Sequence, residues 1–464
     1  MNLESLFIEA DKYDKEYVKY RRNFHKYAEY SWTEFRTTSV IMDFLKNENI
    51  KFLCGNDIIN PKYAWSYPSD EIIKREEERA ISEGASRENI KKMNGYTGVV
   101  AIIDSGNPGP TYGFRFDIDA VMINEAKDEN HRPYREGFSS QNKGAMHACG
   151  HDGHTTMGLF FAKIVNKYKD TFNGKVKIIF QPSEEGDKGA QSVVKSGIID
   201  DLDTVCGIHI LGTKKEAPAL AATWKGLFAT TKFDVEFFGK SAHAGMEPQE
   251  GHNAILAAVQ SISLMQSFIQ NSSGETRLNI GTIQGGTGRN VVPDYCKIEV
   301  ETRGSTSKIE KKLYDACVKC VKNTAAIYGC STEIKVMGYG PTGNGSTNFA
   351  NQIVEAAKSV DELKWIVPFH NNEGGTDDFA YMMQHLQAKG KRACYLNLFT
   401  KLKGGIHNSH YDMDESCLKV GVKILLAVLN SLNEETLWNI VKWWNRLEKF
   451  NLLFFLWFRW QIFR

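Results

Sequence analysis

Hydrophobic residues follow two different periods along the chain. In residues 4–48 they recur at mixed spacings of three and four, and residues 68–94 keep a helical period while carrying many charges, so both stretches predict helices. From residue 97 the pattern changes to short apolar runs separated by Gly and Pro, such as "TGVVAIID", "TYGFRFDID", "KVKIIFQP" and "TVCGIHI". These runs predict strands, and the helical stretches between them predict an α/β sheet.

The segment 225–336 has an element order of its own. A strand at "TKFDVEFFG" is followed by a helix, two strands, a second helix and a last strand at "STEIKVMG". This order is typical of a ferredoxin-like α+β domain. Because helices, strands and Gly-rich loops return from about residue 337, we predict that 225–336 is inserted into a larger, discontinuous α/β domain made of 1–224 and 337–432.

Length and composition agree with two domains. At 464 residues the chain exceeds the size at which a single hydrophobic core stops growing. With 42% hydrophobic and 24% charged residues, it has the balance of a soluble globular protein. The net charge of +1 and the lack of long basic runs in the sequence predict no nucleic-acid partner.

The last residues, 433–464, differ from the rest of the chain. They hold five of the nine tryptophans, and their longest apolar run, "LLFFLWF", is much shorter than the roughly 20 residues that cross a bilayer. We therefore expect no stable membrane insertion. An interfacial amphipathic helix, a partner-binding helix and an artefact without function are the three interpretations, of which the last two are favoured equally.

Cysteine usage and the N-terminus indicate the compartment. Nine cysteines spread from Cys54 to Cys417 without the regular spacing of a disulfide framework, and Cys317 and Cys320 form an isolated CxxC pair within a predicted helix. The first residues, "MNLESLFIEADKYDKEY", are acidic where a secretion signal has a basic start and an apolar run. Both features predict a cytoplasmic protein.

The stretch richest in reactive side chains is "MHACGHDGHTTMG", which places His147, His151 and His154 around Cys149 and Asp152. A metal site, a nucleophilic cysteine with its base, and a histidine-rich loop without chemistry are the three interpretations. Thiolate, imidazole and carboxylate groups are ligands of borderline metals. A cysteine nucleophile and its base usually come from separate segments, whereas His151 is two residues from Cys149. Metal ligation therefore explains more of the stretch.

Three further stretches offer metal ligands at strand ends or Gly-rich turns. Glu184 and Glu185 follow the apolar strand "IIFQP", and adjacent carboxylates repel each other unless positive charge lies nearby. One of them can bind a metal ion while the other takes a proton from metal-bound water. His209 lies within the strand "VCGIHI", where a lone histidine is more often a packed core residue. His407 and His410 follow paired glycines, which permit close approach of a loop to a site.

Together these stretches resemble a known family, the dinuclear metal-dependent amidohydrolases and peptidases that include aminoacylases, plant auxin-conjugate hydrolases and carboxypeptidase G-type enzymes, and above all its branch acting on p-aminobenzoyl-glutamate. The matching stretches run from "RRNFHKYAEYSWTEFRT" through "HRPYREGF", "MHACGHDGHT", "IIFQPSEEG", "ATTKFDVEFFGKSAHAG", "GRNVVP" and "ETRG" to "GIHNSHYDMDE", and the match ends near residue 430. The resemblance implies a metal-dependent aminopeptidase/carboxypeptidase-like catalytic domain with an inserted ferredoxin-like dimerisation or lid domain.

The resemblance also implies two divalent metal ions. Manganese is expected from the nearest relatives, although a thiolate ligand suits zinc better. Glu184 takes the position of the general base. Asp119, in "RFDIDA", either orients a ligand imidazole or serves packing, and both roles stay open. The residues at the metal-ligand positions are Cys149, where other branches use a bridging acid, His151, Glu185, His209 and His407.

Further residues are implied to contact the substrate. His243, in "GKSAHAG", would reach across a dimer into the partner's active site and help to stabilise the oxyanion, and Asn290 lies in a glycine-flanked loop. Arg303 takes the position that binds a substrate carboxylate, a role that suits a guanidinium with two parallel donors. In "GGTDDFA", glycine N–H groups would hold that carboxylate at Gly375 beside Thr376, where the family usually has Ser.

The expected reaction is hydrolysis of the amide between an acyl or aminobenzoyl group and an amino acid, with p-aminobenzoyl-glutamate as the leading substrate. A broad-specificity N-acyl-amino-acid deacylase is the alternative, because the sequence does not reveal the shape of the acyl pocket. A non-catalytic binding subunit of a heterodimer fits less well, because the ligand positions and the base are all filled. The resemblance implies either a homodimer or a heterodimer with a homologous subunit.

Overall fold

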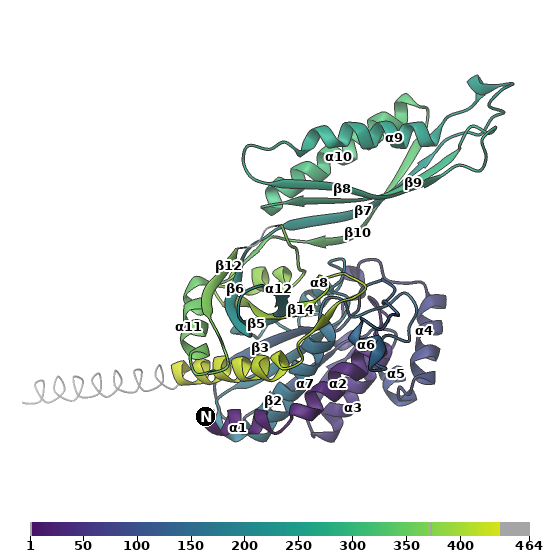
Figure 1. Ribbon diagram of the computed structural model, residues 1–464. Helices are drawn as coiled ribbons and strands as arrows, with labels where there is room; N and C mark the ends of the chain where they lie inside the picture. Colours follow the sequence, from purple (N-terminus) through teal and green to yellow (C-terminus); the bar gives the residue numbers. More distant parts are fainter. Residues whose placement is uncertain (1, 372–373, 437–464) are drawn as a thin grey trace, which may run out of the picture.

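The computed structural model describes residues 2–371 and 374–436. Figure 1 shows a large unit below and a small unit above, the small unit comprising residues 229–340. The large unit is built on a nine-stranded sheet in the order β1-β2-β4-β3-β5-β13-β6-β11, with β12 also paired to β6. Its strands are β1 (Lys51–Cys54), β2 (Val99–Asp104), β3 (Thr111–Asp117), β4 (Lys175–Gln181), β5 (Thr204–Gly212), β6 (Ala219–Leu227), β11 (Gly343–Asn344), β12 (Ile366–Asn371) and β13 (Arg392–Thr400).

Parallel strands form the middle of this sheet. β3 is parallel to both β4 and β5, and β5 is parallel to β13. Every residue of β3 is buried, as expected for a strand with helices on both faces of its sheet. β1 and β2 pair antiparallel at one edge. The predicted α/β class is therefore confirmed, with antiparallel additions to a parallel centre.

Helices pack on both faces of the large sheet. Side chains of β2 alternate between two hydrophobic clusters, since Val99 and Ala101 enter one and Val100 enters the other. The helices predicted within 4–48 and 68–94 are confirmed as α1 to α5. The helices are α1 (Leu3–Asp11), α2 (Asp14–Lys26), α3 (Phe35–Asn47), α4 (Asp70–Ser82), α5 (Arg87–Met93), α6 (Arg132–Arg135), α7 (His151–Lys167), α8 (Ala190–Lys195), α11 (Thr347–Ala357) and α12 (Ala380–Gln387), and residues 417–436 are also helical.

The small unit has the predicted order of strands and helices. Its sheet is antiparallel, in the order β10-β7-β9-β8, so the first and third strands of the unit lie at the centre. Both helices lie on one side of this sheet (Figure 1), and Cys317 and Cys320 pack into the core between them and the strands. The elements are β7 (Ala229–Phe238), α9 (Ala254–Met265), β8 (Thr276–Gly285), β9 (Tyr295–Gly304), α10 (Ser307–Ile327) and β10 (Ser331–Gly340).

Two short connections join the units. β6 ends at Leu227 in the large sheet and β7 begins at Ala229 in the small one, while β10 ends at Gly340 and β11 begins at Gly343. The chain thus changes sheet within a few residues of the predicted boundaries 224/225 and 336/337. Independent folding of the two domains stays a prediction.

The predicted Trp-rich tail, 433–464, lies outside the described residues beyond position 436. Within the described part, no helix combines the length and the apolar character that crossing a bilayer requires. All nine cysteines have free, buried thiols, in agreement with the absence of a disulfide framework that the sequence predicts.

Candidate metal centre

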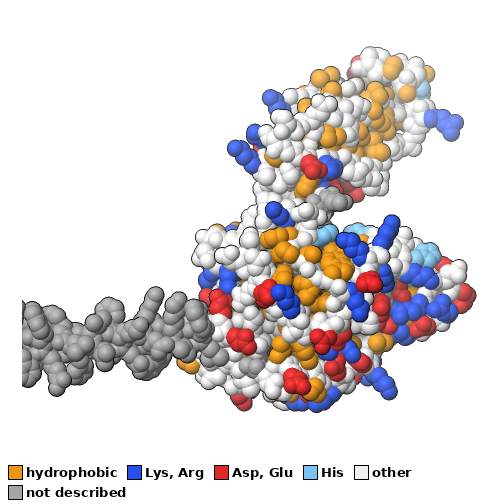
Figure 2. All heavy atoms as spheres, turned by 60° about the vertical axis from the view of Figure 1, so that its left-hand side comes forward, with side chains coloured by type: hydrophobic (Ala, Val, Ile, Leu, Met, Phe, Trp, Pro, Cys, Tyr) orange, Lys and Arg blue, Asp and Glu red, His pale blue; other side chains and the backbone are white. Residues whose placement is uncertain are grey.

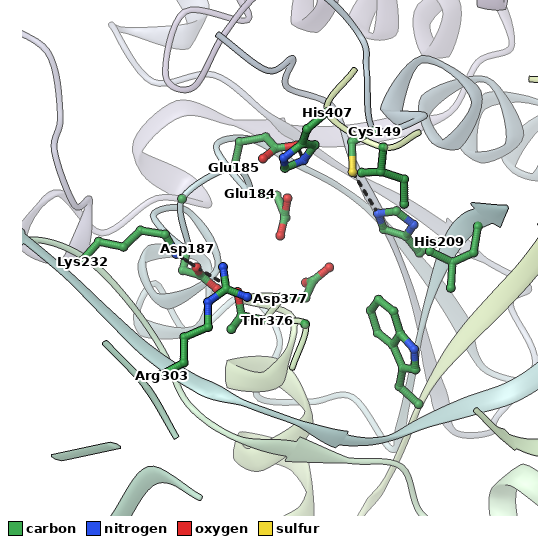
Figure 3. Close-up of a pocket in the computed structure, with 15 residues that line it drawn as sticks. Cys149, Glu184, Glu185, Asp187, His209, Lys232, Arg303, Thr376, Asp377 and His407 are labelled. Carbon is green, nitrogen blue, oxygen red and sulfur yellow. Dashed lines mark hydrogen bonds and ion pairs between the residues drawn. The ribbon is translucent and has the colours of Figure 1, made fainter. Parts of the chain in front are cut away.

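A cavity of about 400 Å³ opens where the parallel strands β4 and β5 end. Glu184 and Glu185 follow β4, His209 lies in β5, and Cys149 lies just before α7 (Figure 3). The carboxyl ends of parallel strands are the usual ligand-binding edge of an α/β sheet, and the volume suits a small molecule. The predicted site residues that line the cavity are Cys149, Glu184, Glu185, His209, Arg303, Gly375, Thr376 and His407.

The five predicted metal ligands converge at one end of this cavity. The Sγ atom of Cys149 lies 3.4 Å from Nε2 of His209, and Nε2 of His407 lies 3.2 Å from Oε1 of Glu185. The Nε2 atom of His151 lies 3.9 Å from the same Glu185 oxygen. The donor atoms of Cys149, His151 and His209 lie within 4.8 Å of one another, and so do those of Cys149, Glu185 and His407. These spacings agree with donors that each lie roughly 2.0–2.3 Å from a shared cation.

Backbone carbonyls fix the tautomer of two of the imidazoles. Nδ1 of His151 donates to the carbonyl of Asp119 at 2.9 Å, and Nδ1 of His209 donates to the carbonyl of Ile210 at 2.8 Å. Nδ1 of each ring therefore carries a proton, and Nε2 is the nitrogen that would bind a metal ion.

His407 reaches the cluster on a loop between two short paired strands, β14 (Leu402–Lys403) and β15 (Asp412–Met413). Its backbone N–H donates to the carbonyl of Ala148 at 2.8 Å, which ties the loop to the stretch that carries Cys149. The φ of His407 is 59°, a left-handed conformation that non-glycine residues adopt rarely and that concentrates at functional sites.

The residues fit a metal ion. Nε2 of His151 is buried and has no hydrogen-bond partner among the described residues. A buried polar atom without a partner is costly, and a cation bound between the thiol, imidazole and carboxylate donors would supply one. The donor set, with one sulfur, three imidazoles and one carboxylate, suits zinc or another borderline divalent ion.

Electrostatics oppose a cysteine nucleophile. Burial, together with Glu185 and Glu184, raises the pKa of the Cys149 thiol well above its ordinary value. Burial also lowers the pKa of His209, its nearest imidazole. A thiolate–imidazolium pair is therefore disfavoured in the protein alone, whereas a bound cation would favour the thiolate. Metal ligation explains this geometry better.

Glu184 lies next to the cluster in an acidic environment. Burial and the nearby Asp377 raise the pKa of Glu184 well above its ordinary value. Oxygens of Glu184, Asp377 and Asp378 lie within 4.8 Å of one another. Arg115 partly balances this charge, because its Nη2 lies 3.2 Å from Oδ1 of Asp378.

Asp119 combines both of its suggested roles. Its carbonyl holds His151, and its buried carboxylate accepts hydrogen bonds from the backbone N–H groups of Glu184, at 3.0 Å, and Glu185, at 2.9 Å. One residue thus orients the imidazole of His151, a predicted ligand, and shapes the turn that presents both glutamates.

Sequence reasoning missed a second buried layer behind the ligands. Nδ1 of His154 bonds to the carboxylate of Asp117, and Nε2 of His154 accepts a hydrogen bond of 2.8 Å from the backbone N–H of Ile210, next to His209. Arg115 donates to Asp117 at 2.6 Å. His154 belongs to the motif, but its acidic partner Asp117 lies in β3, and no local spacing in the sequence predicts that the two meet.

The predicted carboxylate-binding residues lie across the cavity from the ligands. Figure 3 shows Arg303 and Thr376 on the opposite side from Cys149, with Glu184 between. Nη1 of Arg303 donates to the carbonyl of Gly374 at 2.8 Å, which places it next to Gly375. An unpredicted ion pair between Asp187 and Lys232 lies on the same side.

His243 and Asn290 do not line the cavity of their own chain. They lie together on exposed loops of the small unit, where the N–H of Ala244 donates to the carbonyl of Asn290 at 3.1 Å. His410 is also outside the cavity and pairs with Asp128 at 2.8 Å. Action of His243 across a dimer stays a prediction.

Comparisons with known proteins agree with the predicted family. The sequence model of Peptidase family M20/M25/M40 matches residues 113–431. The chain is 38% identical over 407 residues to one of the subunits of p-aminobenzoyl-glutamate hydrolase from Escherichia coli (strain K12), covering 88% of this chain and 93% of that protein. It is also 38% identical over 417 residues to indole-3-acetyl-aspartic acid hydrolase of Enterobacter agglomerans, covering 89% and 95%.

A solved structure supports the same assignment. The aminobenzoyl-glutamate utilization protein from Klebsiella pneumoniae superposes with a TM-score of 0.77 at 33% identity, covering 93% of this chain and 98% of that one. The predicted resemblance and the predicted fold class are confirmed by these likenesses.

Proposed function

Because the chain belongs to peptidase family M20/M25/M40, we propose that it is a metal-dependent amidohydrolase that cleaves p-aminobenzoyl-glutamate or a related N-acyl amino acid. Membership of this family establishes that the chain is a hydrolase that acts on an amide bond. The observation that carries the proposal is the convergence of the five donor side chains beside Glu184 in one cavity.

Two divalent ions would be held by Cys149, His151, Glu185, His209 and His407. When bound, they would supply a Lewis acid for the substrate carbonyl and a water of lowered pKa. Manganese is proposed as the native metal and zinc as the competitor, because the thiolate favours zinc.

The protein groups have separate tasks. Glu184, central in the cavity (Figure 3), accepts the proton of the attacking water and returns one to the leaving amine. Arg303 binds the carboxylate of the amino-acid part through two parallel N–H donors, and the backbone N–H of Gly375 and the side of Thr376 complete that end. The substrate amide thus lies between the carboxylate-binding end and the metal-ligand end.

A dimer formed through the small unit is part of the proposal. β8 is an edge strand of its sheet, and large apolar side chains are exposed near it, among them Leu256, Val259 and Ile283. Figure 2 shows exposed hydrophobic side chains on this unit at the top of the view. Such patches are typical of protein interfaces. His243 and Asn290 would then contribute to the partner's cavity.

The Escherichia coli relative is named as one of the subunits of its hydrolase, which supports a heterodimer with a homologous chain as the second possibility. A cytoplasmic location is proposed because the nine thiols are free.

Metal-dependent release of glutamate tests the proposal. The purified protein is stripped with a chelator, reloaded with manganese or zinc separately, and assayed on p-aminobenzoyl-glutamate, acetylated amino acids and indole-acylated amino acids. We expect hydrolysis that chelation abolishes and one metal restores, fastest on p-aminobenzoyl-glutamate.

Each alternative has a distinct result. Similar rates on acetylated amino acids would support the broad deacylase. Inhibition by an alkylating reagent without chelator sensitivity would support a cysteine nucleophile. Metal binding without hydrolysis of any amide would identify a binding subunit.

A further inference from the structure

A second hollow of about 380 Å³ adjoins the catalytic cavity. The two share Leu211, Trp224, Gly375 and Ile406 as lining residues, so they lie side by side. We call the second hollow the aromatic recess, and its remaining lining residues are Gly212, His370 and Phe399. Among the described residues that line the recess, none is an aspartate, glutamate, lysine or arginine, which suits an uncharged group.

Strand pairing holds the rings of the recess in place. His370 of β12 is the register partner of Trp224 of β6, and their rings are stacked at 6.3 Å with an interplanar angle of 26°. The Phe399 ring meets the His370 ring edge-on at 5.2 Å and 80°. Trp224 is 8% exposed and Phe399 is 6% exposed. The recess is therefore built on the sheet, so its shape is present before a ligand binds.

The recess begins beside the metal cluster. The ring of Trp224 lies 6.0 Å from the ring of His209, tilted by 34°. Arg303 lies across the cavity, on the far side of Glu184 (Figure 3). A substrate with its carboxylate at Arg303 and its amide carbonyl near the metal cluster turns its acyl group toward Trp224.

We propose that the aromatic recess is the acyl-binding subsite and that it selects flat aromatic acyl groups over saturated or short ones. The proposal rests on the proposed hydrolase function and names its acyl specificity. Aromatic rings favour offset or edge-on partners at 4.5–7 Å, and Trp224, His370 and Phe399 are the aromatic side chains that line the recess. An acetyl group would leave the recess filled with water, so it would gain none of this contact energy.

Substrates matched in size test the proposal. Benzoyl-glutamate, cyclohexanecarbonyl-glutamate and acetyl-glutamate are compared as substrates of the metal-loaded wild type and of Trp224→Leu. The first two differ in flatness but hardly in volume, and comparison between proteins cancels the intrinsic reactivity of each amide. We expect the benzoyl-to-cyclohexanecarbonyl ratio of kcat/KM to fall about tenfold in Trp224→Leu, and the benzoyl-to-acetyl ratio to fall further.

Controls separate packing from binding. Trp65→Leu removes an indole whose Nε1 donates to Gln191 at 2.7 Å, away from both hollows, and it should leave both ratios unchanged. Phe399→Leu is the second recess variant if Trp224→Leu does not fold, and it should lower the same ratios. Melting temperatures establish that each variant is folded.

A binding measurement gives a readout without turnover. Calorimetry compares benzoate with cyclohexanecarboxylate on metal-loaded wild type and Trp224→Leu, and we expect a benzoate preference of about tenfold that the variant loses. Hydrolysis with unchanged ratios in folded Trp224→Leu and Phe399→Leu would overturn the recess assignment alone. Absence of hydrolysis on all three amides would overturn the proposed function instead, and the calorimetric preference would still decide whether the recess binds aromatic acids.

Discussion

The metal cluster and the exposed loops of the small unit are built in opposite ways. Around the cluster, backbone carbonyls hold the imidazoles of two predicted ligands, that of Asp119 on His151 and that of Ile210 on His209. His243 and Asn290, by contrast, lie on exposed loops, which are joined by a hydrogen bond from the N–H of Ala244 to the carbonyl of Asn290. The large unit thus brings its predicted ligands together within one chain, whereas the proposed roles of His243 and Asn290 would require a second chain.

The first prediction concerns the cavity of the large unit, where Glu184 is the proposed base. Glu184→Gln keeps the size of the side chain but cannot accept the proton, so turnover should fall at least about a hundredfold while metal content stays unchanged. Metal analysis and kcat measured on the same preparation test this. Near-normal turnover would remove Glu184 from the role of base.

The second prediction concerns the exposed loop of the small unit that carries His243. His243→Ala should lower kcat about a hundredfold without loss of metal, because one oxyanion donor is removed. Co-expression of His243→Ala with Glu184→Gln, followed by purification of the mixed dimer, should restore one intact site per mixed dimer. Random mixing should recover about a quarter of wild-type activity. If His243 acted within its own chain, mixing would recover none.

The third prediction concerns the support of the cluster. Asp119→Asn should weaken metal binding about tenfold to a hundredfold, since an amide has only one oxygen to accept the N–H groups of Glu184 and Glu185. Chelator competition measures this affinity. Asp104→Asn, on the exposed end of β2, is the matched control and should bind metal as the wild type does.

The smallest prediction contrasts the pH dependence of stability in the two units. Although burial raises it, hydrogen bonds from Lys12 and Lys167 lower the pKa of Glu9, in the large unit, to about 2. Burial raises the pKa of Glu310, in the small unit, above its ordinary value. Glu9 thus stabilises the fold above pH 4.5 and loses that effect as the pH falls toward 2, whereas Glu310 favours folding below 4.5 and loses that effect as the pH rises.

Melting temperatures of Glu9→Gln and Glu310→Gln at several pH values test this contrast. At pH 7, Glu9→Gln should melt about 1 °C below the wild type, because its lysine partners are half-exposed and solvent screens the pairs. Glu310→Gln should melt above the wild type at pH 7, and its advantage should shrink as the pH falls. Shifts of the same sign in both variants at pH 7 would contradict the contrast.

Local sequence predicted most of the ligand cluster and of the folding pattern. Cys149 and His151 share one motif, and Glu184 and Glu185 end a strand whose apolar run is unmistakable. The period of apolar residues likewise predicted the helices at 4–48 and the order of strands and helices along the small unit. These features depend on neighbours in the chain, which the sequence displays directly.

Contacts between elements that are distant in the sequence were not predicted. Asp117 and His154 meet only because α7 lies against β3, and Trp224 and His370 meet because β6 and β12 pair. Their separation along the chain is set by intervening elements and carries no periodic signal. For the same reason the sequence did not predict the shape of the acyl-binding pocket, although Trp224 and His370 can be read from the sequence.

The ion pair between Asp187 and Lys232 has a mechanical consequence. Asp187 follows the two glutamates by two residues, and Lys232 lies in β7, which a single residue links to the large sheet. Through this ion pair, a rotation of the small unit about that link would shift the turn that carries Glu184 and Glu185. Binding of a second molecule to the small unit would in this way change the position of Glu184, although no residue of that molecule contacts Glu184.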